Sequence, residues 1–351
     1  MNPTIPQSVE ERPAEKILIQ FAAQHPSGPT LTNTIGRAQF ATQFARRHPD
    51  SPVTCWLLDL YQTQQITASQ VLPPNLQLTC TADPSLDPVE LVAWSFTRQG
   101  NGELVREMLQ MAHQRLTLGG CLVAAIDNAS DRWLHKLLQD LFGKVTRQPS
   151  QDGVLYVAHK ASPLKKLKNY AAQFAFRDGP RLIHLQSRPG VFSHRELDGG
   201  ARALIKSMTV GSEAKVLDLG SGSGAVGIAA ALRAENVQVD AIDANPRAVE
   251  STLASANRND VTSLKASLDC DGRTVTPRTY DLVLANPPYF SHFRIARLFV
   301  EIAHRALKPE GVLILVTKTP QWYLDHLPGM FESITTQTTG HYHVVIARAT
   351  H

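Results

Sequence analysis

The stretch Val216-Leu217-Asp218-Leu219-Gly220-Ser221-Gly222-Ser223-Gly224 decides the fold, because a short apolar run ends there in three glycines at alternate positions. The run predicts a buried strand, and residues 225–232 predict a helix directly after it. Without Cβ atoms the turn can bend tightly and let its backbone approach a ligand, while the helix start offers unpaired N–H groups. This order indicates a Rossmann-like α/β domain with a cofactor site.

An acidic residue follows the next predicted strand. The apolar run 237–242 ends at Asp243, nineteen residues after Gly224. A carboxylate there can accept two hydrogen bonds from a ribose diol, which is the usual role of an acid at that strand end. The spacing Gly222-x-Gly224-x-x-Gly227 also satisfies the dinucleotide fingerprint, so these residues alone leave a nicotinamide-dependent dehydrogenase open.

The tetrapeptide Asn286-Pro287-Pro288-Tyr289 favours a different chemistry. It directly follows the predicted strand 281–285, at the sheet edge where ligands of such folds bind. The two prolines fix the backbone, so the Asn286 carboxamide and the Pro287 carbonyl can face one amino group as two acceptors. Such acceptors favour the pyramidal geometry in which the nitrogen lone pair of a conjugated amine is free. Tyr289 supplies a flat ring, and the set suits methylation of a planar amine.

The chain repeats itself at an offset of 191 residues. Glu90-Leu91-Val92-Ala93 aligns with Asp281-Leu282-Val283-Leu284, and in the same register Gly120 falls on Gly311. Each copy orders strand, helix, turn with glycine and strand, which is the pattern of a doubly wound sheet. We therefore predict an α/β fold with two tandem Rossmann-like domains. The expected counterpart of the glycine turn in the first copy is Trp56-Leu57-Leu58-Asp59-Leu60-Tyr61-Gln62, which has no glycine, so we expect the N-terminal domain to be degenerate and to lack a cofactor site.

Length and charge give the expected domain bounds. The 351 residues are 43% hydrophobic, enough for two domains with their own cores. Basic residues outnumber acidic ones by eight to one in residues 159–195, whereas residues 1–158 and 196–351 have net charges of −2 and −1. We expect two domains over those outer ranges, joined by a basic linker and lead-in segment. The strip is suited to binding a polyanion such as nucleic acid, and a solvated linker without a ligand is the alternative.

Several classes are disfavoured. The four cysteines are far apart and form no Cys-x-x-Cys pair, no secretory signal opens the chain, and no apolar run is long enough to span a membrane. We expect a cytoplasmic protein that contacts no membrane. The alternating His341-Tyr342-His343 is more typical of a strand than of a metal site, so no metal is expected.

The glycine turn, Asp243 and Asn286-Pro287-Pro288-Tyr289 together resemble class I S-adenosylmethionine-dependent methyltransferases of the amino-methylating branch. Gly190-Val191-Phe192-Ser193 and Leu197-Asp198-Gly199-Gly200-Ala201-Arg202 are similar to the segment before the cofactor motif in ribosomal RNA guanine-N2 methyltransferases, which also have two tandem methyltransferase-like domains, the first degenerate. The resemblance implies methyl transfer from S-adenosylmethionine to the exocyclic 2-amino group of a guanine in ribosomal RNA. This chain departs from the Asn-Pro-Pro-Phe-His often found there, since it has Tyr289 and Phe290, with His292 two places later.

The resemblance also assigns roles to residues. The expected catalytic set is Asn286 and Pro287, which orient the amine, and Tyr289, which stacks on the base. The expected cofactor contacts are Asp218, Gly220, Gly222, Gly224, Asp243 on the ribose and Asp269 near the adenine. The expected substrate contacts are Phe192, Pro288 and Phe290, and the charge of the basic strip adds Lys165, Lys166 and Lys168 as expected phosphate contacts.

Three alternatives remain open at this point. The same tetrapeptide serves methyltransferases of a release-factor glutamine and of adenine N6 in nucleic acid. A non-catalytic RNA-binding relic is the third. We expect ribosomal RNA or a ribosomal subunit as partner, a monomeric protein, and a first domain that binds RNA or shields the second.

Overall fold

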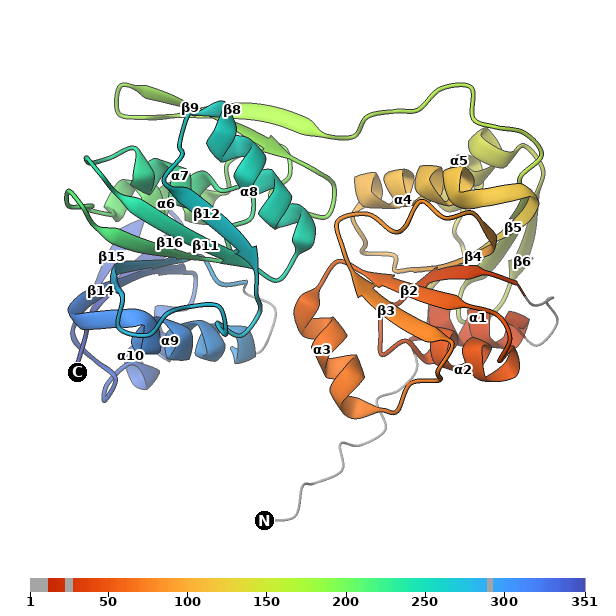
Figure 1. The fold of residues 1–351 in the computed structure, drawn as a ribbon, viewed down its shortest axis with the longest axis horizontal. Helices are drawn as coiled ribbons and strands as arrows, with labels where there is room; N and C mark the ends of the chain where they lie inside the picture. The colour runs from red at the N-terminus through yellow and green to blue at the C-terminus, as the bar shows by residue number, and fades with distance from the viewer. Residues whose placement is uncertain (1–11, 23–27, 289–292, 351) are drawn as a thin grey trace, which may run out of the picture. The chain divides into compact units, whose positions relative to one another are not determined.

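The computed structural model describes residues 12–22, 28–288 and 293–350. By the contacts between its Cα atoms the chain divides into two compact units, one of residues 1–57 and 62–170, the other of residues 58–61 and 171–351. Each unit contains one mixed, largely parallel β-sheet covered by helices (Figure 1). In the part of the chain that is described, no helix is long and apolar enough to cross a membrane.

The second unit is a doubly wound α/β domain. Its strand order is β12-β11-β10-β13-β14-β16-β15, and β16 is antiparallel to both of its neighbours. A hairpin of β8 and β9 precedes this sheet and packs against α8. The elements are β8 (Ala172–Asp178), β9 (Arg181–Ser187), α6 (Gly199–Ser207), β10 (Lys215–Leu219), α7 (Ala225–Ala231), β11 (Gln238–Asp243), α8 (Pro246–Arg258), β12 (Leu264–Leu268), β13 (Tyr280–Ala285), α9 (Arg294–Ala306), β14 (Leu307–Thr317), α10 (Pro320–His326), β15 (Phe331–Thr339) and β16 (Tyr342–Ala349).

The first unit has the same topology. Its sheet order, β3-β2-β1-β4-β5-β7-β6, places each strand where the second unit has its counterpart. The elements up to the end of this sheet are α1 (Pro13–Ala22), β1 (Thr30–Asn33), α2 (Gln39–Arg47), β2 (Val53–Leu57), α3 (Leu60–Ser69), β3 (Leu76–Cys80), β4 (Val89–Phe96), α4 (Gly102–Arg115), β5 (Leu116–Ile126), α5 (Trp133–Phe142), β6 (Val145–Pro149) and β7 (Val154–His159).

The offset of 191 residues holds in the strand pairing. In the first unit Val89 pairs with Leu116 and Leu91 with Cys121, and in the second Tyr280 pairs with Leu307 and Leu282 with Val312. Both sheets therefore carry the same register shift at the same place. The predicted α/β fold of two tandem Rossmann-like domains is confirmed.

One detail of the predicted repeat was wrong. The glycine turn follows β10, and the strand in the same place of the first sheet is β1, not β2. The true counterpart of the turn is therefore the loop 34–38, whereas the stretch from Trp56 to Gln62 begins within β2, the counterpart of β11.

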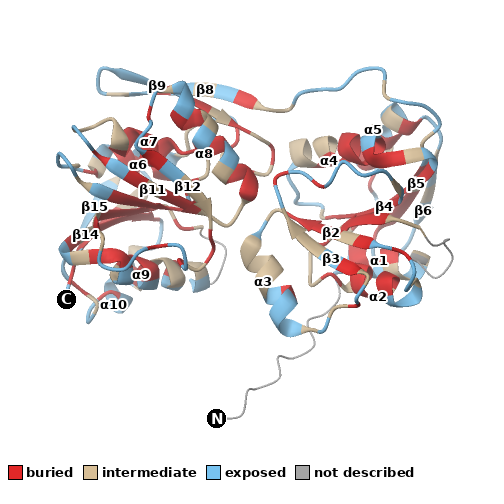
Figure 2. Ribbon diagram, viewed as in Figure 1, coloured by how far each residue is buried: buried red, intermediate tan, exposed pale blue. Residues whose placement is uncertain are grey.

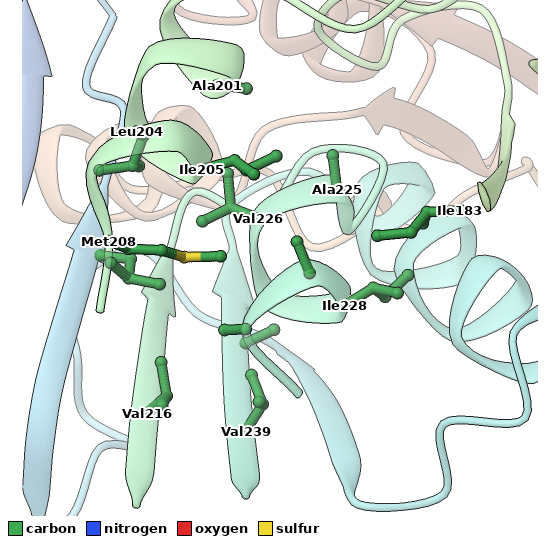
Figure 3. Packing of buried hydrophobic residues seen from close by; sticks show 14 of the residues in the cluster. Ile183, Ala201, Leu204, Ile205, Met208, Val216, Ala225, Val226, Ile228 and Val239 are labelled. Atoms are coloured by element: carbon green, nitrogen blue, oxygen red, sulfur yellow. The ribbon is translucent and has the colours of Figure 1, made fainter. Parts of the chain in front are cut away.

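The core of the second unit lies on both faces of its sheet. Along β10, Val216 packs in one apolar cluster with α6 and α7, while Leu217 and Leu219 pack in another with α9. Figure 2 shows the inner strands as buried, and Figure 3 shows Ile205 of α6 beside Val226 of α7 in the apolar cluster that covers β10 and β11. This packing holds the carboxyl ends of the central strands in fixed positions.

Candidate active site

Three neighbouring strands of the second unit end side by side in residues that the sequence singles out. Leu219 of β10 pairs with Ile242 of β11 on one side and with Ala285 of β13 on the other. The next residue along each strand is Gly220, Asp243 and Asn286. The parallel register thus brings the glycine turn, the acid and the Asn-Pro-Pro segment to one edge of the sheet, where ligands of such folds bind.

The glycine turn is tied to the end of β11. The backbone N–H groups of Gly220 and Ser221 donate to the carbonyl of Ile242 at 2.9 and 3.1 Å. The N–H of Gly222 donates to Asp243 Oδ2 at 2.9 Å, and Thr252 of α8 donates its hydroxyl to the Gly222 carbonyl at 3.3 Å. These bonds fix the turn before any ligand arrives.

Gly220, Gly222 and Gly224 have φ angles of 74°, 57° and 84°, a region in which residues with a Cβ are strained. A Cβ atom on Gly222 would meet nothing within 4 Å, so this face of the turn is open. On Gly224 it would lie 3.1 Å from the Thr252 backbone, so there the glycine permits close packing against α8. The open face and the glycine conformations fit the approach of a cofactor.

Two carboxyl groups accompany the turn. Asp218 is only 2% exposed, and its Oδ2 accepts a hydrogen bond from the Gly227 N–H at 2.9 Å. Burial raises the pKa of the Asp218 carboxyl to about 7 and also raises the pKa of Asp243, whose oxygens accept the N–H groups of Gly222 and Asn245. A cationic ligand at this edge would favour the ionised forms of both groups. S-adenosylmethionine is such a cation, so the two carboxyl groups at this edge fit it.

Asp269, just beyond β12, has its carboxylate engaged by its own loop. Its two oxygens accept the backbone N–H groups of Asp271, Gly272 and Thr274 and the Thr274 hydroxyl. Burial works against ionisation here, but these hydrogen bonds hold the pKa below its usual value. Four donors use the lone pairs that a carboxylate has, so the side chain shapes the loop. Contact between Asp269 and an adenine ring stays a prediction.

Asn286 is held by a residue that the sequence reasoning did not assign to the site. Its Nδ2 donates to Asp198 Oδ2 at 2.9 Å. Pro287 is buried and Pro288 is half-buried, so the segment leaves β13 along a fixed path. The predicted stacking residues Tyr289 and Phe290, together with His292, lie outside the described residues.

On the expected substrate side, Phe192 is 60% exposed and follows the buried Val191. The carbonyl of Gly190 accepts a hydrogen bond from Asn245 Nδ2 at 2.8 Å, and Asn245 caps α8 two residues after Asp243. This bond ties the segment that carries Phe192 to the end of β11, and so to the cofactor edge.

Lys165, Lys166 and Lys168 lie in the first unit and have exposed side chains. Gln110 of α4 fixes the backbone at Lys168, because its Oε1 accepts the Lys168 N–H at 2.8 Å and its Nε2 donates to the Lys168 carbonyl at 2.9 Å. The structure therefore places these three lysines on an anchored surface segment of the first unit.

In the first unit, the loop that corresponds to the glycine turn is bound by a side chain of the protein itself. The buried Glu15 of α1 accepts hydrogen bonds from the Thr34 hydroxyl and from the N–H groups of Ile35 and Gly36, the latter two at 3.0 and 2.9 Å. At the offset of 191 residues, Ser95-Phe96-Thr97-Arg98 replaces Asn286-Pro287-Pro288-Tyr289. In the first unit, the Glu15 carboxylate thus occupies backbone N–H groups that a ligand would need. For this reason we expect a cofactor site only in the second unit.

Metal ligands do not gather in the described ranges, where no group of three or more His, Cys, Asp or Glu side chains could hold an ion. His341 lies just before β16. His343 lies within that strand and contacts the Thr338 hydroxyl of β15 through Nδ1 at 3.3 Å.

Comparison with known proteins agrees with this geometry. Residues 182–347 match the family model of the "Methyltransferase small domain". The fold, the cofactor edge and this match support assignment of the second unit to the class I S-adenosylmethionine-dependent methyltransferases.

Among its relatives is a ribosomal RNA small subunit methyltransferase C of Shewanella denitrificans, 27% identical over 246 residues that cover 68% of each chain. A ribosomal RNA large subunit methyltransferase G of Psychromonas ingrahamii is 28% identical over 65% of this chain and 62% of its own. Among solved structures, the T. thermophilus 16S rRNA N2 G1207 methyltransferase in complex with AdoMet and guanosine matches with a TM-score of 0.81 at 21% identity, over 96% of this chain and 92% of that one. Its likeness extends over both units.

Proposed function

We propose that this protein transfers a methyl group to the exocyclic 2-amino group of a guanine in ribosomal RNA. The observation that carries the proposal is the edge at which Gly220, Asp243 and Asn286 follow three neighbouring strands. It joins a turn suited to the cofactor with an amide suited to a planar amine. The ribosomal RNA methyltransferases among its relatives support RNA as the substrate.

In this proposal the glycine turn and the two carboxyl groups bind the cofactor, and the Asn-Pro segment orients the target amine. S-adenosylmethionine, when bound, supplies an electrophilic methyl group on a positively charged sulfur. Asp243 would accept the ribose hydroxyls, Asp218 would lie near the methionine end, and Gly220, Gly222 and Gly224 would allow close approach. Asn286 Oδ1 and the Pro287 carbonyl would accept the hydrogens of the target amine and aim its lone pair. The chemistry then rests mostly on positioning, with the proton lost to solvent after transfer.

On the RNA side, Tyr289 would stack on a base turned out of its helix, with Phe192, Pro288 and Phe290 around it. The first unit would bind RNA or shield the second, and Lys165, Lys166 and Lys168 would contact phosphates. We further propose a cytoplasmic monomer whose partner is ribosomal RNA or a ribosomal subunit.

Mass mapping of methylated nucleotides tests the proposed target. Ribosomal RNA from cells that lack the protein should have lost one N2-methylguanine, and the purified protein should restore it with S-adenosylmethionine. Loss of an N6-methyladenine or of a methylated release-factor glutamine would select one of the alternatives. An RNA modification profile that does not change would favour a non-catalytic RNA-binding protein.

Replacement of Lys165, Lys166 and Lys168 with Ala should weaken RNA binding irrespective of sequence, because lysine side chains on phosphates read no base. The slope of log affinity against log salt concentration should become shallower by about one unit for each phosphate that the variant no longer neutralises. Filter binding at several salt concentrations measures both quantities.

A control variant with Arg98, Lys136 and Lys144 replaced by Ala removes the same charge from exposed sites elsewhere in the first unit. It should leave most of the affinity intact. Equal losses in the two triple variants would mean that only net charge matters and that the segment is a solvated linker.

A further inference from the structure

The end of the Asn286 side chain that faces the target amine decides whether the site can work. A carboxamide has an acceptor oxygen at one end and a donor NH2 group at the other, and a rotation of 180° exchanges them. Only the oxygen can accept a hydrogen from the amine. In the proposed function, on which this inference rests, something must therefore prevent the rotation.

Asp198 supplies that constraint. An ionised carboxylate only accepts hydrogen bonds, so the group that faces Asp198 Oδ2 at 2.9 Å has to be the NH2 of Asn286. Rotation would place the Asn286 oxygen against a carboxylate oxygen and break the bond. The contact leaves Oδ1 as the end available to the target amine.

Asp198 is itself fixed by the fold. It is the N-cap of α6, and the same Oδ2 accepts the Ala201 N–H at 3.1 Å. Leu204 and Ile205 of this helix are buried in the apolar cluster over β10 (Figure 3). The position of the Asn286 amide is thus fixed by a packed helix as well as by its own strand.

The two glycines after Asp198 make the contact possible. A Cβ atom on Gly200 would lie 2.8 Å from both Asn286 Oδ1 and Asp198 Oδ2, and one on Gly199 would lie 2.8 Å from the Tyr342 ring. Both distances are too short for real contacts, so a larger residue at position 200 would displace the Asn286 and Asp198 side chains or the helix start, and one at position 199 would displace the Tyr342 ring or the helix start. The sequence Asp198-Gly199-Gly200 therefore combines a cap, an acceptor and space for the amide.

We propose that Asp198 is a positioning residue of the methyl transfer, which orients the Asn286 carboxamide so that its oxygen faces the target amine, with Gly200 leaving the space that this requires. The Asp198 charge also polarises the amide, which strengthens its oxygen as an acceptor when positive charge develops on the amine nitrogen.

Asp198→Ser is the main test, because serine still caps a helix but is too short to reach Asn286. Single-turnover methyl transfer to ribosomal RNA from cells that lack the protein should slow by about tenfold to a hundredfold, the scale of a misplaced reacting group. The dissociation constant of S-adenosylmethionine should not change. Asp198→Asn keeps an acceptor without the charge and should retain an intermediate rate.

Asn101→Ser is the matched control. Asn101 caps α4 in the first unit by accepting the N–H groups of Glu103 and Leu104, so this variant makes a comparable capping change away from the site. Its thermal unfolding should be affected about as much as that of Asp198→Ser, and its transfer rate should equal that of the parent.

A readout independent of activity comes from the NH2 group of Asn286 in protein labelled with 15N at asparagine, with Asn286→Ala to assign the signals. Asp198→Ser and Gly200→Ala should both shift these signals, and Asn101→Ser should not. Gly200→Ala should also slow transfer, although alanine favours a helix over glycine and the Gly200 backbone suits it.

Two results would overturn the inference. One is an Asp198→Ser protein with the parent rate. The other is Asn286 NH2 signals that do not respond to Asp198→Ser. If Asn286→Ala itself methylates at the parent rate, the proposed catalytic role of Asn286 fails instead, whatever the signals show.

Discussion

Asn286→Ala should lower the single-turnover rate of methyl transfer about a hundredfold or more, the scale on which one preorganised polar partner acts. In the proposed mechanism the carboxamide oxygen would accept a hydrogen from the target amine, and charge would develop on that nitrogen in the transition state. The interaction is therefore stronger in the transition state than in the ground state, so its removal lowers the rate of the chemical step. Rapid-quench measurement with the cofactor bound and the enzyme in excess over RNA isolates this step.

The fold and the cofactor site should survive this change. The two prolines still shape the segment after β13, and the removed side chain gives up its hydrogen bond to Asp198. Ser95→Ala is the matched control, since Ser95 holds the corresponding position in the first unit and is buried there. A parent rate for Asn286→Ala with S-adenosylmethionine bound would disprove the mechanism, whatever the resemblance to known methyltransferases.

The repeat and the main cofactor motif could be predicted because each depends on residues that are close together in the sequence. A gap-free offset preserves strand and helix positions together, and this is why the pairs Val89 to Leu116 and Tyr280 to Leu307 agree. The glycine turn was equally plain, since an apolar strand that runs into three glycines has few other interpretations.

The counterpart of the turn in the first unit could not be predicted because strand identity depends on pairing. β1 reads Thr30-Leu31-Thr32-Asn33, which is short and has only one apolar residue, so its apolar signal is weak. The stronger apolar run at β2 resembles a first strand more closely. Only the sheet order, set by contacts between distant segments, shows that β1 lies at the position of β10.

The roles of Asp198 and Glu15 were beyond sequence reasoning for a similar reason. Asp198 reaches Asn286 across 88 residues of chain, and Glu15 reaches Gly36 across 21. A carboxylate in a sequence does not indicate which donor it will meet. An acid followed by two glycines at a helix start was the available signal for Asp198, because such glycines lower helix propensity and need a reason to be there.

Asp243→Ala should weaken binding of S-adenosylmethionine by about 1.5 to 3 kcal/mol for each charge-assisted hydrogen bond that the ribose can no longer make. The carboxylate already accepts the N–H groups of Gly222 and Asn245, one on each oxygen, and each oxygen has a further lone pair. In the proposed function the two ribose hydroxyls would donate to those two positions. Titration calorimetry should find one site per chain in the parent protein, because Glu15 occupies the corresponding loop of the first unit.

Since Asp243→Ala also removes two internal hydrogen bonds, its effect on affinity has to be separated from its effect on folding. Asp131→Ala provides the comparison: Asp131 is a buried carboxylate of the first unit that accepts the Leu134 N–H and the Tyr156 hydroxyl. It should lower the thermal midpoint without changing the dissociation constant, whereas Asp243→Ala should change both. Equal affinities in the two variants would mean that Asp243 only braces the glycine turn, and two sites in the parent would mean that the first unit still binds the cofactor.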